Sequence, residues 1–114
     1  MTTLYGIKNC DTMKKAMRWL SDNQIDYTFH DYRKDGIDAQ WIKTMLTTIP
    51  LDNFINKRGT TYRQLDDEVK QSLNIDNAVD LLITQPAMIK RPILIHTDHI
   101  ELGFKPDLYS RIFA

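Results

Sequence analysis

The sequence predicts a single α/β domain, and three observations lead to this prediction. Its 114 residues, 42% of them hydrophobic and 26% charged, have the size and make-up of one globular domain. Strand-type and helix-type patterns alternate near the N-terminus, and two strand-type segments precede a helix-type segment near the C-terminus. No repeat, low-complexity tract or linker interrupts this order.

The first third of the chain has the pattern of a strand, a helix and a second strand. Thr3–Ile7 is a short β-prone segment, and Asn9 or Asp11 is placed to cap the helix that follows. That helix has an apolar stripe at i, i+3, i+4 and i+7, made of Met13, Ala16, Met17 and Leu20. The aromatic, alternating segment Tyr27–Tyr32 is the second strand, so a βαβ unit is expected.

The middle of the chain has helical periodicity. Asp38 is placed to cap a helix that ends before Pro50. The apolar face of this helix comprises Trp41, Ile42, Met45 and Leu46. After a polar loop between Phe54 and Thr61, the pattern predicts one helix whose apolar residues are Tyr62, Leu65, Val69 and Leu73. A further helix should contain Val79, Leu82 and Ile83, with Asp76 as its cap.

The last quarter of the chain has the pattern of a hairpin and a helix. Pro92–His96 and Ile100–Phe104 are β-prone and flank a turn at Thr97–His99. A final amphipathic segment is expected to bury Leu108, Ile112 and Phe113.

The composition excludes several classes of function. Fifteen Lys and Arg balance fifteen Asp and Glu, so the chain lacks the global positive charge that nucleic acids or anionic membranes attract. A single cysteine excludes an internal disulfide, and no His and Cys spacing suggests a metal site. The longest aliphatic runs are three residues long, and no signal peptide is evident. We expect a cytoplasmic monomer that binds no metal.

Cys10 lies between the first predicted strand and the first turn of the predicted helix. The free N–H groups and the positive end of the dipole at a helix N-terminus stabilise a thiolate. Lys8 and Lys14 would add to this effect. The alternative is that Cys10 is a small buried apolar residue, which is common for free cysteines. Position alone leaves both interpretations open.

The three histidines have no spacing that brings them to Cys10, so no Cys–His pair is predicted. His30, His96 and His99 are interpreted as structural or surface residues.

Four segments resemble the ArsC/Spx family of thioredoxin-like proteins, most closely its small YffB-like branch. These segments are Tyr5–Ala16, Asn56–Gly59, Gln85–Leu94 and Gly103–Pro106. The resemblance covers nearly the whole chain. It implies a thioredoxin-like, glutaredoxin-type fold in one domain of residues 1–114, with a helical subdomain inserted at roughly residues 36–86.

The resemblance also implies roles for individual residues. Cys10 would be the nucleophilic thiol, and Arg58 and Arg91 would bind an anionic substrate. Lys8, a cation close to Cys10 in the sequence, is expected to contribute to the same anion binding. Lys105 stands where arsenate reductases of the family have a third arginine. A lysine lacks the planar fork that binds an oxyanion through two hydrogen bonds.

Two further residues bear on the resemblance to thioredoxin-like proteins. The fold places a cis proline beside the active cysteine, so the resemblance implies a cis Arg91–Pro92 bond. Met13 occupies the position of the second cysteine of a Cys-x-x-Cys motif. An oxidised Cys10 would therefore be resolved by an external thiol.

These residues predict a glutathione-dependent thiol oxidoreductase. It would hold no bound cofactor, and glutathione or a glutaredoxin-like thiol donor would reduce it while a disulfide or a small oxyanion is its substrate. One alternative is an arsenate reductase that uses glutathione or glutaredoxin. Another, of a different class, is a non-enzymatic binding module like Spx proteins, which contact RNA polymerase and usually have a Cys-x-x-Cys pair.

Overall fold

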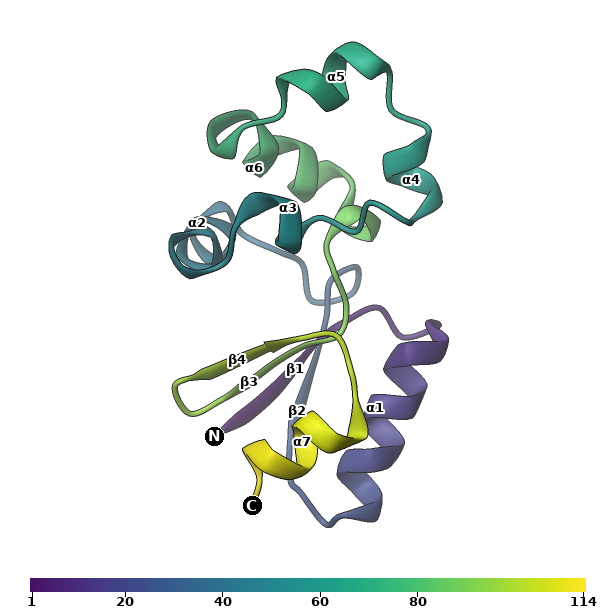
Figure 1. The fold of residues 1–114 in the computed structure, drawn as a ribbon, viewed down its shortest axis with the longest axis vertical. Helices are drawn as coiled ribbons and strands as arrows, with labels where there is room; N and C mark the ends of the chain where they lie inside the picture. Colours follow the sequence, from purple (N-terminus) through teal and green to yellow (C-terminus); the bar gives the residue numbers. More distant parts are fainter. The chain divides into compact units, whose positions relative to one another are not determined.

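The computed structural model describes residues 1–114, which form two units (Figure 1). The first unit comprises residues 1–35 and 91–114, and the second comprises residues 36–90. The second unit therefore contains the helical region that the sequence places at roughly 36–86. None of the helices is long and apolar enough to cross a membrane.

The first unit contains a four-stranded mixed sheet. Its strands are β1 (Thr2–Gly6), β2 (Thr28–Asp31), β3 (Ile93–His96) and β4 (His99–Leu102), in the order β2-β1-β3-β4 (Figure 1). β1 and β2 are parallel and are joined by helix α1 (Asp11–Asp22), as the predicted βαβ unit requires. β3 is antiparallel to both β1 and β4. The predicted hairpin is present, but its turn is shorter than expected because His99 already belongs to β4.

The second unit consists of short helices. They are α2 (Ala39–Thr48), α3 (Leu51–Phe54), α4 (Thr60–Arg63), α5 (Asp67–Ser72), α6 (Ile75–Thr84) and the 3-10 helix η1 (Pro86–Met88). As predicted, Asp38 caps α2, and its carboxylate accepts a hydrogen bond of 2.7 Å from the backbone N–H of Trp41. The buried apolar residues of α2 and α6 are Ile42, Met45, Leu46, Ala78, Val79 and Leu82.

Two helix predictions for this unit are wrong. The expected helix from Tyr62 to Leu73 is two helices, because Asp66 leaves the helical conformation and starts α5 as its N-cap, and Val69 is exposed. The cap of α6 is Asn74, because its side chain accepts the N–H of Asn77 and the Asn77 side chain accepts the N–H of Asn74. Asp76 lies in the first turn of α6.

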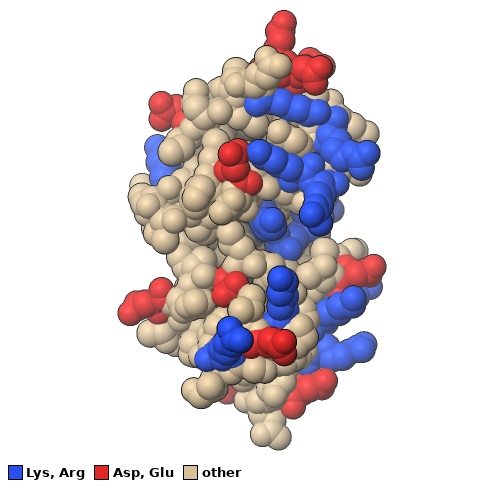
Figure 2. Space-filling view, viewed as in Figure 1, with Lys and Arg blue, Asp and Glu red and all other residues tan.

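The polar segment before α4 contributes to a basic side of the second unit. Figure 2 shows that Lys and Arg side chains gather on the side of this unit where Figure 1 has α4. A surface hollow of about 400 Å³ on this unit is lined by Asp52, Ile55, Asn56, Lys57, Arg58 and Lys90. Three of these side chains are basic and one is acidic, so the hollow is locally positive although the whole chain is neutral.

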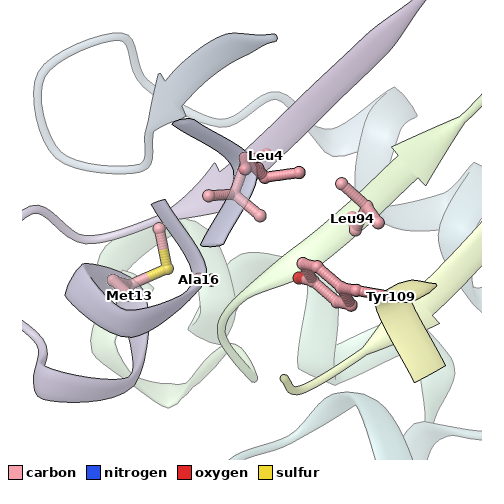
Figure 3. Packing of buried hydrophobic residues seen from close by; sticks show 6 residues of the cluster. Leu4, Met13, Ala16, Leu94 and Tyr109 are labelled. Atoms are coloured by element: carbon pink, nitrogen blue, oxygen red, sulfur yellow. The ribbon is translucent and has the colours of Figure 1, made fainter. Parts of the chain in front are cut away.

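The core of the first unit lies where α1 and helix α7 (Pro106–Ile112) pack with the sheet (Figure 3). Its fully buried members are Leu4, Met13, Ala16, Leu20, Leu94 and Tyr109. Three of the four residues in the predicted stripe of α1 are therefore buried, and Met17 is partly buried. The prediction for α7 is wrong, because Tyr109 is its buried residue and Leu108, Ile112 and Phe113 are only partly buried.

Tyr109 belongs to an aromatic group in the first unit. Its ring fills the space below the sheet and meets the rings of Trp19, Phe104 and Phe113, at centroid distances of 5.5, 4.7 and 6.5 Å.

Candidate active site around Cys10

Cys10 is the N-cap residue of α1. Its backbone is extended, with φ −111° and ψ 133°, and its carbonyl accepts the first helical hydrogen bond, 3.0 Å from the N–H of Lys14. The expected cap, Asn9 or Asp11, is therefore wrong. No side chain caps this helix in the usual way. The thiol instead occupies the place that a capping oxygen would take.

The groups that act on the Cys10 thiol come from the helix start and from an arginine. Burial of the half-exposed thiol raises its pKa, but the backbone N–H groups of Met13 and Thr12 and the hydrogen bond and charge of Arg91 lower it, and the net pKa is lowered. All of these groups favour the thiolate over the thiol. The thiolate is the nucleophilic form of cysteine, so the site favours attack by Cys10.

Arg91 reaches Cys10 from the segment that precedes β3. The Arg91–Pro92 peptide bond is cis, the isomer that the resemblance implies. Arg91 is half-buried and Pro92 is buried, and the carbonyl of Pro92 accepts a hydrogen bond of 2.8 Å from the N–H of Gly103. The residue that follows β4 thus holds the backbone immediately before β3. A long, partly buried arginine whose backbone is held in this way loses little further entropy when it binds an anion.

Tyr32 belongs to the same region and was missed by the sequence reasoning. Only 1% of Tyr32 is exposed, and the charge of Arg91 acts on its phenol. The sequence pattern placed Tyr32 at the end of a strand among other aromatic residues. That signal predicts burial and does not distinguish Tyr32 from Tyr27 or Phe29.

Arg58 lies in the second unit and is exposed on the basic hollow described above. Its neighbour Lys57 forms an ion pair with Asp52, with 2.9 Å between Nζ and Oδ1. This hydrogen bond raises the pKa of Lys57. The role of Arg58 in anion binding stays a prediction.

The two expected lysines of the first unit are both exposed. Lys8 lies in the segment between β1 and Cys10, and Lys105 is the N-cap residue of α7. Their contribution to anion binding also stays a prediction.

The histidines make local contacts in the first unit. Oγ1 of Thr2 and Nδ1 of His96 are 2.7 Å apart, and Nε2 of His99 is 3.1 Å from Oε1 of Glu101. The ring of His30 lies 5.0 Å from that of Tyr5. These contacts agree with the structural interpretation of the three residues. The structure contains no group of three His, Cys, Asp or Glu side chains that could hold a metal ion.

The model of the ArsC family matches residues 5–112, which include Cys10, Arg91 and nearly all elements of both units. The chain belongs to the ArsC family. Its mixed sheet and helices form the thioredoxin-like fold of this family's solved structures.

Three proteins are similar to nearly the whole chain. A solved protein named YffB is 42% identical with a TM-score of 0.93, and each chain covers 100% of the other. An arsenate reductase (ArsC) related protein from Brucella melitensis is 47% identical with a TM-score of 0.80, over 98% of this chain and 93% of that one. A global transcriptional regulator Spx of Bacillus anthracis is 28% identical, over 94% of this chain and 82% of the relative.

Proposed function

We propose that this member of the ArsC family is a glutathione-dependent thiol oxidoreductase that acts through Cys10 in the cytoplasm. The observation that supports this proposal most directly is the set of three groups that lower the pKa of one thiol. The N–H groups of Thr12 and Met13 and the guanidinium of Arg91 all favour the thiolate of Cys10. A cysteine that served only as a core residue would gain nothing from a cationic partner.

The proposed reaction is exchange at a mixed disulfide of glutathione. The Cys10 thiolate attacks the glutathione sulfur of the substrate, the substrate disulfide breaks, and the substrate leaves as a thiolate that takes up a proton. Cys10 is then bonded to glutathione. A second glutathione thiolate attacks the sulfur of the glutathione bound to Cys10. This step releases the Cys10 thiolate and oxidised glutathione. One molecule of glutathione is thus consumed, and its thiol proton balances the proton taken up by the substrate.

The need for an external thiol follows from the sequence. Cys10 is the only cysteine of the chain, so no internal thiol can release the mixed disulfide. Glutathione also carries carboxylates that a guanidinium binds through charge-assisted hydrogen bonds. We assign such contacts to Arg91 in the first unit, with Lys8 and Lys105 as further cations, and propose that Arg58 offers the same chemistry on the hollow of the second unit.

Mass spectrometry of the intact protein tests the proposal. After exposure to oxidised glutathione, the parent protein should gain one glutathionyl group, and added glutathione should remove it. Cys10→Ser should gain none. The proposal is wrong if the folded parent protein resists modification at neutral pH while the same protein in denaturant is modified.

Arsenate reduction is a second candidate function, and the Arg91–Cys10 hydrogen bond favours it because arginine also binds oxyanions. The Cys10 thiolate would attack arsenic and displace a hydroxyl group, which leaves as water. Glutathione would then attack the Cys10 sulfur, so that two thiols become a disulfide and arsenic is reduced by two electrons. Arsenite release with glutathione as donor would support this function.

A binding function like that of the Spx relatives is a third candidate. Its support is the similarity to regulators such as that of Bacillus anthracis over 94% of this chain. Met13 replaces the second cysteine of their usual pair, so a disulfide switch within the chain is not possible here. A pull-down with RNA polymerase tests this function. Polymerase binding that persists in Cys10→Ser, together with slow thiol exchange by the parent, would favour it over the oxidoreductase.

A further inference from the structure

We propose that Tyr32 is a positioning residue that holds the guanidinium of Arg91 in place for Cys10. This inference rests on the proposed function, because it concerns how the Cys10 thiolate is stabilised. It adds a third residue, Tyr32, to the contact between Arg91 and Cys10.

The strand register brings Tyr32 and Arg91 to the same end of the sheet. β1 pairs with β2 so that Gly6 is opposite Asp31, and β1 pairs with β3 so that Tyr5 is opposite Ile93. If both registers are continued beyond the strand ends, Ile7 is opposite Tyr32 on one side and opposite Arg91 on the other. Their Cα atoms are then about two strand spacings apart, roughly 10 Å, which two long side chains can bridge. Cys10 follows three residues later on the central chain segment.

The backbone that carries Tyr32 is held firmly. Its N–H donates a hydrogen bond of 2.8 Å to the carbonyl of Gly6, which continues the pairing of β1 and β2. The following turn is closed by the carboxylate of Asp31, which accepts the N–H groups of Arg33 and Lys34 at 2.9 and 3.3 Å. Tyr32 is 1% exposed, so its ring has a fixed place. A side chain fixed at both backbone and ring can restrict a more flexible neighbour.

The two side chains interact electrostatically. Burial raises the pKa of Tyr32, and the positive charge of Arg91 acts in the opposite direction. The phenol is therefore neutral at physiological pH and lies within electrostatic range of the guanidinium. Tyr5 is the other group whose charge acts on this phenol.

A neutral acceptor suits this position better than a carboxylate would. A carboxylate beside Arg91 would hold the guanidinium but would also cancel its charge and repel the Cys10 thiolate. A phenol oxygen accepts a hydrogen bond and adds no net charge. The full positive charge of Arg91 thus stays available to the sulfur.

The test is the pKa of the Cys10 thiol, measured from the rate of alkylation by iodoacetamide against pH. Tyr32→Phe removes the phenol oxygen and keeps the ring. We expect it to raise the thiol pKa by about half a unit, which lowers the thiolate fraction at neutral pH about threefold. In an Arg91→Ala background, Tyr32→Phe should cause no further change, because the group that it positions is absent.

Tyr109→Phe is the matched control. Tyr109 is as fully buried as Tyr32 and lies in the same unit, but its hydroxyl has no hydrogen-bond partner and Arg91 is not among the charges that act on it. This substitution should leave the Cys10 pKa unchanged. Thermal unfolding of each variant shows whether it is folded.

The outcomes separate this inference from the proposed function. If the parent thiol has an ordinary pKa, the proposed function fails. If the parent pKa is low and Arg91→Ala raises it but Tyr32→Phe does not, only the role of Tyr32 is wrong. Equal shifts in Tyr32→Phe and Tyr109→Phe would also overturn that role, because they would reflect a general effect of core substitution.

Discussion

Gly6 lies against Met13 so closely that no side chain fits between them. A Cβ atom at Gly6 would collide with Sδ of Met13 and lie 2.7 Å from its Cε. Met13 is fully buried, and its backbone N–H is one of the groups that lower the pKa of the Cys10 thiol. Because Gly6 has no side chain, the end of β1 packs directly against the start of α1. This contact sets where the N-terminus of the helix lies.

We expect Gly6→Ala to destabilise the protein by about 1–3 kcal/mol, the usual cost of overpacking a core. Chemical denaturation measures this change. Gly59→Ala is the matched control, because Gly59 has an ordinary φ of −75° and an added Cβ would meet only the partly exposed Asn56. The control should cost less than about 1 kcal/mol. Equal effects of both substitutions would show that the Gly6–Met13 contact is not tight.

Removal of the Arg91 guanidinium should raise the pKa of the Cys10 thiol. We expect a shift of about one unit in Arg91→Ala, and thus roughly a tenfold smaller thiolate fraction at neutral pH. The pH dependence of the alkylation rate measures it. Arg111→Ala removes an exposed arginine of α7 and should have no effect. A parent midpoint at or above the ordinary thiol value of about 8.5 would contradict the assignment.

The lowered pKa of Cys10 also makes stability depend on pH. Between the lowered pKa of the folded state and the ordinary value of about 8.5 in the unfolded state, the unfolded chain binds more protons. The free energy of unfolding of the parent should therefore rise, relative to that of Cys10→Ser, as the pH increases through this window. The contribution is complete above the unfolded pKa and is lost as the pH falls through the folded pKa.

Urea denaturation of the parent and Cys10→Ser at pH 6 and pH 9.5 measures this difference. Other titrating groups are shared by the two proteins and cancel. A difference that stays constant with pH would contradict a stabilised thiolate.

Substitution of the α6 cap should destabilise the second unit. Asn74→Ala removes the 3.0 Å hydrogen bond from the backbone N–H of Asn77 to the Asn74 side chain, one half of the reciprocal pair, and should cost about 1 kcal/mol. Asp66→Ala at the N-cap of α5 is the control, since that side chain makes no capping hydrogen bond. Thermal unfolding should show the larger loss for Asn74→Ala, and the reverse order would contradict the assigned cap.

Replacement of Lys105 tests the choice between glutathione and an oxyanion. Lys105→Arg adds a planar fork at the N-cap of α7 and should strengthen arsenate or sulfate binding about tenfold, with little change for glutathione. Isothermal titration calorimetry measures the affinity for both ligands. Arg58→Ala and Arg91→Ala should each weaken the binding of these ligands about ten- to a hundredfold. Unchanged binding in both alanine variants would mean that neither arginine holds the anion.

Local chemistry in the sequence was enough to place many elements. The apolar stripe of α1, the cap at Asp38 and the hairpin near the C-terminus all depend on residues within a few positions of one another. The position of Cys10 at a strand-to-helix junction is local in the same sense. For these features, hydrophobic periodicity and hydrogen bonding along the chain already select one conformation.

Packing alone decided where one predicted helix breaks and which of several neighbouring apolar residues is buried. The segment from Tyr62 to Leu73 has the spacing of one helix, but the structure breaks it at Asp66. Periodicity counts apolar positions and does not show which of them a neighbouring element will cover. The same limit applies to α7, where Tyr109 is buried in place of Leu108.

The sequence by itself determined the class of fold, the βαβ unit and the position of Cys10 at a helix start, because each arises from local hydrogen bonding and periodicity. Only the tertiary structure decided that Arg91 donates to the Cys10 sulfur and that Tyr32 lies within range of Arg91. These residues are separated by about 60 to 80 positions in the sequence and meet because β2 and β3 pair with opposite edges of β1. Strand pairing between distant segments depends on the burial of the whole sheet, which no short sequence pattern contains.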